Sequence, residues 1–119
     1  MLINLTNHPS ALWSEEQKKA AERYGEIIDL PFPAVDATGD ETYIASLADE
    51  YVQKLKDIAN GRDVTVHLMG EMTLTFALVR RLQTNGIRCV ASTTQRIVTE
   101  TEPNHKEVIF QFIKFRRYE

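Results

Sequence analysis

The stretch that most constrains the fold covers residues 64–81, VTVHLMGEMTLTFALVRR. It begins with an apolar, β-branched run at residues 64–68, which predicts a buried strand. Met69-Gly70-Glu71 interrupts this run, and a segment rich in helix-forming residues follows. A strand that enters a helix through a glycine-containing turn presents backbone N–H groups and a helix N-terminus, which can bind a ligand. Many α/β proteins use the same turn only to reverse the chain, so a structural role stays open.

Periodicity on either side of this stretch predicts alternating strands and helices. Ser14 and Gln17 have capping-box spacing at the start of a first helix. Gly25 and Gly86 are placed to end the first and third helices. The expected strands are residues 2–5, 26–30, 64–68 and 87–92, and the expected helices are residues 14–24, 43–59 and 72–85.

The C-terminal part differs in kind, because two extended runs occupy residues 93–101 and 106–115. Glu102-Pro103-Asn104-His105 separates them and predicts a β-hairpin turn rather than a helix. The last run has apolar residues on both faces, so we expect it to be covered on both faces by helices or by a partner subunit. This apolar pattern predicts a homodimer.

Composition limits the class of protein. The 119 residues, of which 43% are hydrophobic, suit one globular domain with a real core. A net charge of −3 argues against a partner that is long nucleic acid. A single cysteine, Cys89, excludes a disulfide framework, and its plain interpretation is a small buried hydrophobe. No signal-peptide pattern and no membrane-spanning run is present, so we expect a cytoplasmic protein.

The order of elements predicts an α/β fold with a mainly parallel sheet, strand order 2-1-3-4, flanked by helices and followed by the hairpin. In this order, strands are added first on one side of the first strand and then on the other, so the strand order reverses between the first and third strands. Ligands bind outside the carboxyl ends of the strands at such a point. The polar loops at residues 6–10 and 69–73 meet there, with residues 92–96 next to them. The candidate ligand-binding residues are Thr6, Asn7, Ser10, Met69, Gly70, Met72, Thr73, Ser92, Thr93, Thr94 and Arg96.

Two side chains in these loops have proton-transfer chemistry. His8 could act as a general acid or base, it could donate a hydrogen bond to a phosphate, or it could be a surface histidine beside a proline. Glu71 could orient a hydroxyl group of a ligand or accept its proton, or it could simply complement the positive end of its helix. Arg96 is the only cation in the three loops and the best candidate for an anionic ligand, although a solvated strand residue is the alternative.

Other polar residues have plainer explanations. Ser10, Thr73, Thr93 and Thr94 are residue types that commonly form turns and caps. His67 alternates with apolar neighbours, so a packed, hydrogen-bonded core histidine is favoured over a catalytic one. Three scattered histidines and one cysteine lack metal-ligand spacing, and no phosphate-cradling loop or dinucleotide fingerprint is present. The sequence therefore predicts neither a metal nor a cofactor.

Three segments together, NLTNHPS, LMGEMTLTFALVRRL and CVASTTQR before a terminal hairpin, resemble the small CRISPR-associated Rossmann-fold (CARF) proteins. The similarity is greatest to their standalone relatives, the ring nucleases. This resemblance implies a single Rossmann-like domain whose loops bind a cyclic oligoadenylate across a homodimer, and ring nucleases cut that messenger. The chain departs from the family at Glu71, where a lysine or a small residue often follows the glycine.

The leading hypothesis is therefore a homodimer that binds cyclic oligoadenylate and cleaves it without a metal. Attack of a ribose 2′-hydroxyl on the neighbouring phosphate needs only in-line geometry and charge stabilisation. His8 and Glu71 are the catalytic candidates. The alternatives are a nucleotide-sensing module that leaves its ligand unchanged and an interaction protein whose polar loops are only turns.

Overall fold

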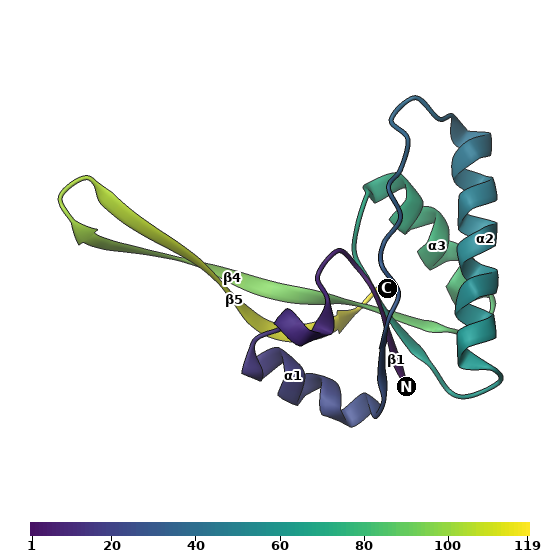
Figure 1. Cartoon of the computed structure of the whole chain (residues 1–119), viewed down its shortest axis with the longest axis horizontal. Helices are drawn as coiled ribbons and strands as arrows, with labels where there is room; N and C mark the ends of the chain where they lie inside the picture. Colours follow the sequence, from purple (N-terminus) through teal and green to yellow (C-terminus); the bar gives the residue numbers. More distant parts are fainter.

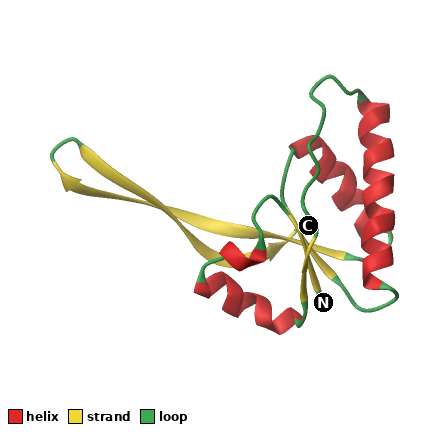
Figure 2. Cartoon of the chain, viewed as in Figure 1, coloured by secondary structure: helices red, strands yellow, loops and turns green.

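Strands and helices alternate along the chain until a long hairpin ends it (Figures 1 and 2). The computed structural model describes all 119 residues. The short turns η1 and η2 cover Ser10–Leu12 and Glu22–Tyr24. The main elements are β1 (Leu2–Leu5), α1 (Glu15–Ala21), β2 (Ile27–Asp29), α2 (Glu41–Ala59), β3 (Thr65–Leu68), α3 (Met72–Thr84), β4 (Arg88–Glu102) and β5 (His105–Arg117).

All five strands join one mixed sheet in the order β2-β1-β3-β4-β5. The strands β1 to β4 pair in parallel, and β5 pairs with β4 antiparallel. The expected α/β class is confirmed. The expected order of 2-1-3-4 becomes 2-1-3-4-5, because the returning strand of the hairpin belongs to the same sheet. Successive strands are therefore added on one side of β1 up to β2 and on the other side from β3 onward, so the strand order reverses between β1 and β3.

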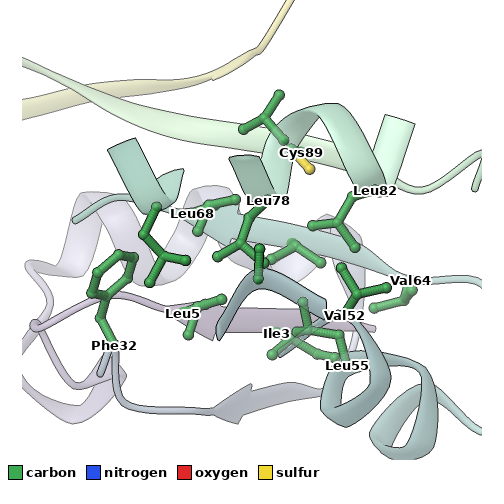
Figure 3. Packing of buried hydrophobic residues seen from close by; sticks show 14 of the residues in the cluster. Ile3, Leu5, Phe32, Val52, Leu55, Val64, Leu68, Leu78, Leu82 and Cys89 are labelled. Atoms are coloured by element: carbon green, nitrogen blue, oxygen red, sulfur yellow. The ribbon is translucent and has the colours of Figure 1, made fainter. Parts of the chain in front are cut away.

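Helices cover both faces of the sheet. The strands β1 and β3 place Ile3 and Leu5, and Val66 and Leu68, against α2 and α3, where the main core forms (Figure 3). The alternate residues face α1, and a smaller cluster there contains Leu2, Trp13, Ala21, Val90, Phe112 and Phe115. This period of two is the ordinary geometry of a strand covered on both faces.

Local chemistry explains where the helices begin and end. The side chain of Ser14 accepts a hydrogen bond from the backbone of Gln17, so the predicted N-cap is confirmed. Asp40 caps α2 in the same way, and Asn60 ends it in the left-handed conformation with φ of 49°. No helix combines the length and the apolar character needed to cross a lipid bilayer.

The expected loop at residues 92–96 is wrong. These residues lie inside β4, which continues unbroken from Arg88 to Glu102. Pairing with β3 stops at Val90, but β5 supplies hydrogen-bonding partners along the rest of the strand. Threonine, isoleucine and valine dominate this stretch, and β-branched residues fit an extended strand better than a loop.

The β4–β5 hairpin projects from the body of the domain as a two-stranded ribbon, which we call the arm and define as residues 95–111 (Figures 1 and 2). Pro103 and Asn104 form its turn, and Asn104 has a φ of 66°. The predicted hairpin is thus confirmed. Large apolar side chains remain exposed on or beside the arm, namely Val98, Val108, Ile109, Phe110 and Ile113.

Candidate functional site

A cavity of about 500 Å³ opens beside the carboxyl ends of β1 and β3, on the face of the sheet that carries α1. This is the point where strand order reverses, the usual place for a ligand in an open α/β sheet. The first two predicted loops do meet here. The cavity is lined by Thr6, Asn7, His8, Trp13, Gln17, His67, Met69, Gly70, Ser92, Thr94 and Phe110.

A row of polar side chains crosses three neighbouring strands below this cavity. Strand register places Asn4 of β1 beside Asp29 of β2 and His67 of β3. The Asn4 amide nitrogen donates to Oδ1 of Asp29 at 2.8 Å, and Nδ1 of His67 lies 2.8 Å from Oδ1 of Asn4. Asn4 and His67 are 1% and 2% exposed and lie in the protein interior, whereas Asp29 ends the row at the exposed edge strand β2. Hydrogen bonding therefore holds the orientation of the His67 ring.

His67 is neutral in this setting. Burial, aided by the nearby His8, lowers the pKa of the His67 imidazole to about 4. Its second ring nitrogen, Nε2, is buried and has no hydrogen-bond partner. Because His67 also belongs to the cavity lining, the structure shows a core histidine beside the site whose Nε2 has neither a partner nor accessible surface. The prediction of a packed, hydrogen-bonded core histidine is confirmed for Nδ1, whereas Nε2 has no hydrogen bond.

The loop after β1 is fixed through the backbone of His8. The His8 carbonyl accepts hydrogen bonds from Nδ2 of Asn4 at 2.8 Å and from Nε1 of Trp13 at 3.1 Å. Its N–H donates to Oγ1 of Thr6 at 3.1 Å. The His8 side chain is exposed at the cavity. A rigid backbone therefore carries a free imidazole, which is the arrangement expected of a positioned acid or base.

The cavity wall combines flat apolar surfaces with uncharged polar groups. Trp13 and Phe110 contribute aromatic rings, and Asn7 and Gln17 contribute side-chain amides. Hydroxyl groups come from Thr6, Ser92 and Thr94, and no lysine or arginine belongs to the lining. Such a surface suits a heterocycle that can stack and form hydrogen bonds better than it suits an isolated phosphate.

Glu71 has a structural task in this structure. It is the N-cap of α3, and its carboxylate accepts hydrogen bonds from the backbone N–H groups of Thr73 and Leu74 at 2.9 Å and from the Thr73 hydroxyl. Hydrogen bonds from Leu74 and Thr73 lower the pKa of the Glu71 carboxyl. A carboxylate thus occupies the helix N-terminus that the sequence suggested as a ligand site, and it is poorly suited to accept a proton.

The turn between β3 and α3 is held by packing. A Cβ atom on Gly70 would overlap the ring of Phe32, which is itself buried in the main core. The absence of a side chain at Gly70 is therefore explained by this close contact. Met69 is fixed by Ser92, whose hydroxyl lies 3.1 Å from the Met69 sulfur. Both Met69 and Gly70 line the cavity, as predicted.

Five predicted ligand-binding residues lie outside the cavity lining. Ser10 donates to Oδ2 of Asp29 at 2.9 Å and ties the first loop to β2. Thr73 binds Glu71, and the Thr93 hydroxyl donates to the Lys114 carbonyl. Met72 is 84% exposed and lines a separate, more apolar cavity with Phe76.

Arg96 is the fifth. Arg96 pairs with Phe110 across the hairpin, and Thr94, two residues earlier, pairs with Phe112. The side chains of Arg96 and Thr94 therefore lie on the same face of the ribbon, the face that borders the cavity. Arg96 lies two residues beyond Thr94, the last residue of β4 in the cavity lining, and is exposed to solvent. It can approach a ligand that extends past Phe110.

Sequence reasoning missed four contributors, Asn4, Trp13, Gln17 and Phe110. One signal was present, because Asn4 and His67 are hydrogen-bonding residues at the third position of two short, mainly apolar strands. Trp13 and Gln17 reach the cavity only because the α1 segment folds beside β5, and Phe110 reaches it only because β5 returns along β4. These placements depend on tertiary contacts.

No three side chains of histidine, cysteine, aspartate or glutamate come together to hold a metal ion. The buried Cys89 belongs to the main core, and burial raises the pKa of its thiol to about 12. Comparison with curated proteins and with solved structures gives no match. A family model, described as the Uncharacterized protein MJ1673 family, matches residues 1–116, and the chain belongs to that family.

Proposed function

We propose that this protein is a Rossmann-like module that binds a cyclic oligoadenylate in the cavity beside β1 and β3. The observation that carries the proposal is the composition of the cavity wall at the strand-order reversal, with two aromatic rings, two amides, three hydroxyls and the unpartnered nitrogen of His67. Aromatic rings stack on bases of any kind, and amide or hydroxyl groups bind base edges and ribose. The resemblance of the loop sequences to CARF proteins supports the choice of ligand.

The phosphates of such a ligand need a cation, and we assign this role to Arg96. Its guanidinium follows Thr94 on the same face of the ribbon, beyond the edge of the cavity. A ring of nucleotides is larger than one base, so a base in the cavity leaves phosphates outside it. An arginine at that distance along the strand is well suited to bind them.

Cleavage of the ligand is a second candidate function, and the position of His8 favours it. The His8 imidazole lies at the cavity on a backbone fixed by three side chains. It could accept the proton of a ribose 2′-hydroxyl as that oxygen attacks the adjacent phosphorus, and return the proton to the departing 5′-oxygen, which leaves a 2′,3′-cyclic phosphate and a 5′-hydroxyl. Glu71 has no part in this proposal, since its carboxylate already caps α3.

The deciding experiment incubates the protein with cyclic tri-, tetra- and hexa-adenylate in EDTA, measures affinity by calorimetry and separates the products by chromatography. Thr94→Glu, which places a negative charge at the cavity, should weaken binding at least about tenfold. Thr99→Glu, on the same strand but outside the lining, should bind like the parent. If the parent binds none of the three compounds, the proposal fails.

The products then distinguish sensing from cleavage. Bound ligand recovered unchanged supports a sensing module, whereas linear products that form in EDTA support a metal-independent nuclease. In that case His8→Ala should lower the cleavage rate about a hundredfold or more and leave affinity largely intact.

We also propose that the functional unit is a homodimer. The arm exposes apolar side chains on both faces, with Val98 and Val108 on one face and Ile109 on the other. An isolated two-stranded hairpin is only marginally stable, so a covering partner is expected. Charges of both signs are mixed along the arm, including the facing pair Glu100 and Lys106. Mixed charge suits a second copy of the same ribbon, because contacts across a two-fold axis pair different residues of the two copies and so allow a positive group to meet a negative one.

A further inference from the structure

We propose that Nε2 of His67 accepts a hydrogen bond from an N–H or O–H donor of the ligand, and that in an adenylate this donor is the 6-amino group. The identity of the ligand rests on the proposed function. The need for a donor does not, because it follows from the surroundings of His67 alone.

The first step fixes the proton on the ring. The Asn4 amide nitrogen faces two acceptors, the His8 carbonyl and the Asp29 carboxylate, both at 2.8 Å. Its amide oxygen therefore faces Nδ1 of His67, which must carry the hydrogen to donate. In a neutral ring the proton is then absent from Nε2, which is an acceptor only.

The second step excludes the neighbouring side chains as donors. The rings of Trp13 and Phe115 pack against His67 with centroid distances of 5.4 and 5.2 Å. Phe115 has no donor, and the indole N–H of Trp13 is already bound to the His8 carbonyl. Nε2 remains buried without a partner in the protein. A buried polar atom of this kind normally finds one.

The third step connects the atom to the cavity. The His67 ring belongs to the cavity lining, together with Trp13 and Phe110. Nε2 has no accessible surface in the free protein, so a flat base that enters beside these rings must move a neighbouring side chain to bring a donor to it. Because the acceptor is held by the Asp29–Asn4–His67 row, it cannot turn to present a hydrogen instead. The site should reject a base with a carbonyl oxygen in place of the amino group.

The test compares cyclic tetra-adenylate with cyclic tetra-inosinate, in which a carbonyl replaces each 6-amino group, and runs the tri- and hexanucleotide pairs in parallel. We expect the inosinate to bind at least about tenfold more weakly. Equal affinity would overturn the inference while leaving the proposed function intact. If neither compound binds, both proposals fall.

Nitrogen NMR of histidine-labelled protein gives a second readout that a merely structural role would not change. In the free protein, the His67 Nε2 signal should be that of an unprotonated nitrogen. Addition of cyclic tetra-adenylate should shift this signal as a hydrogen bond forms, and cyclic tetra-inosinate should not. A bound adenylate that leaves the signal unchanged would contradict the assignment.

The matched variant is His67→Asn, whose amide N–H can replace the Nδ1 donor to Asn4 while Nε2 is removed. We expect it to lose the preference for adenylate over inosinate to within about twofold. His105→Asn is the control, because it removes an imidazole beside the turn of the arm, outside both the cavity lining and the hydrogen-bonded row. The control should keep the preference. If His67→Asn does not fold, the affinity ratio and the nitrogen signal of the parent decide the question.

Discussion

His67 shows how one residue can serve both the core and a site. Its Nδ1 belongs to a buried hydrogen-bonded row, its ring packs against Trp13 and Phe115, and its Nε2 has no partner. The protein therefore keeps a buried imidazole that must stay neutral. That requirement has an energetic consequence which can be measured without any ligand.

The first prediction concerns pH. The pKa of His67 is about 4 in the folded protein, against an ordinary value of 6.5. Between these values the unfolded chain binds a proton that the folded chain does not, so stability falls as pH decreases. From pH 7 to pH 5 we expect a loss of about 2 kcal/mol in the free energy of unfolding from this residue. Urea unfolding at several pH values measures it.

The control for this prediction is His67→Asn, which removes the titrating group. The variant will differ in stability at every pH, so the informative quantity is the slope. The range stops at pH 5 because Asp29 and Glu71, whose pKa values are lowered, also begin to destabilise the fold in more acidic solution. Parallel slopes for parent and variant would contradict a neutral, buried His67.

At this scale the sequence indicated the chemistry but not the contacts. Alternation between Val66 and Leu68 correctly placed His67 inside a strand. Its partner Asn4 is 63 residues away, and only the register of β1 against β3 brings the two together. Register between distant parallel strands depends on the whole sheet. The unsatisfied Nε2 could therefore not be predicted from the sequence.

At the scale of elements, α3 shows that a helix N-terminus at a suitable position need not be available to bind an anion. Its predicted start after Glu71 is confirmed, and its N-terminus lies at the strand-order reversal. The Glu71 carboxylate accepts hydrogen bonds from two N–H groups of the first turn that would otherwise be available to an anion. The negative charge that a ligand could have supplied is already built into the chain.

The second prediction separates the capping role of Glu71 from a catalytic one. Glu71→Asp keeps a preferred N-cap carboxylate, so stability should change little. Glu71→Ala removes the cap and should lower the free energy of unfolding by about 1 kcal/mol. Thermal melts measure both, alongside ligand affinity and cleavage. A large rate loss in the Asp variant with unchanged stability would show instead that Glu71 transfers a proton.

Most elements could be predicted because their patterns are local. Apolar periodicity identified α2 and α3, and the Pro103-Asn104 turn identified the hairpin. The segment at Ser92–Gln95 was assigned both to an extended run and to a polar loop, since hydroxyl and amide side chains in isolation suit a loop, and the loop is wrong. Its extended form depends on pairing with β5, whose partner residues follow about twenty positions later along the chain.

At the scale of the whole molecule, the arm is the unusual feature, since the longest dimension is 51 Å against 25 Å for the shortest. The apolar pattern on both faces of the last strand predicted a cover on each face. The structure supplies it for Phe112 and Phe115 through the cluster beside α1, but leaves Val108, Ile109 and Ile113 exposed outside the cavity lining. The remaining apolar surface is what the proposed second copy would bury.

The last prediction follows from that surface. Sedimentation at micromolar concentration should give a species of twice the 13.6 kDa monomer mass. Val108→Lys puts a charge among the exposed apolar residues and should shift the protein to monomer, because a buried, unpaired ammonium opposes association. Thr101→Lys adds the same charge beside the turn of the arm and should stay dimeric. A monomeric parent would contradict the proposed assembly. Should Val108→Lys alone become monomeric while still binding cyclic tetra-adenylate with parental affinity, each cavity acts independently and the arm serves only to join the copies.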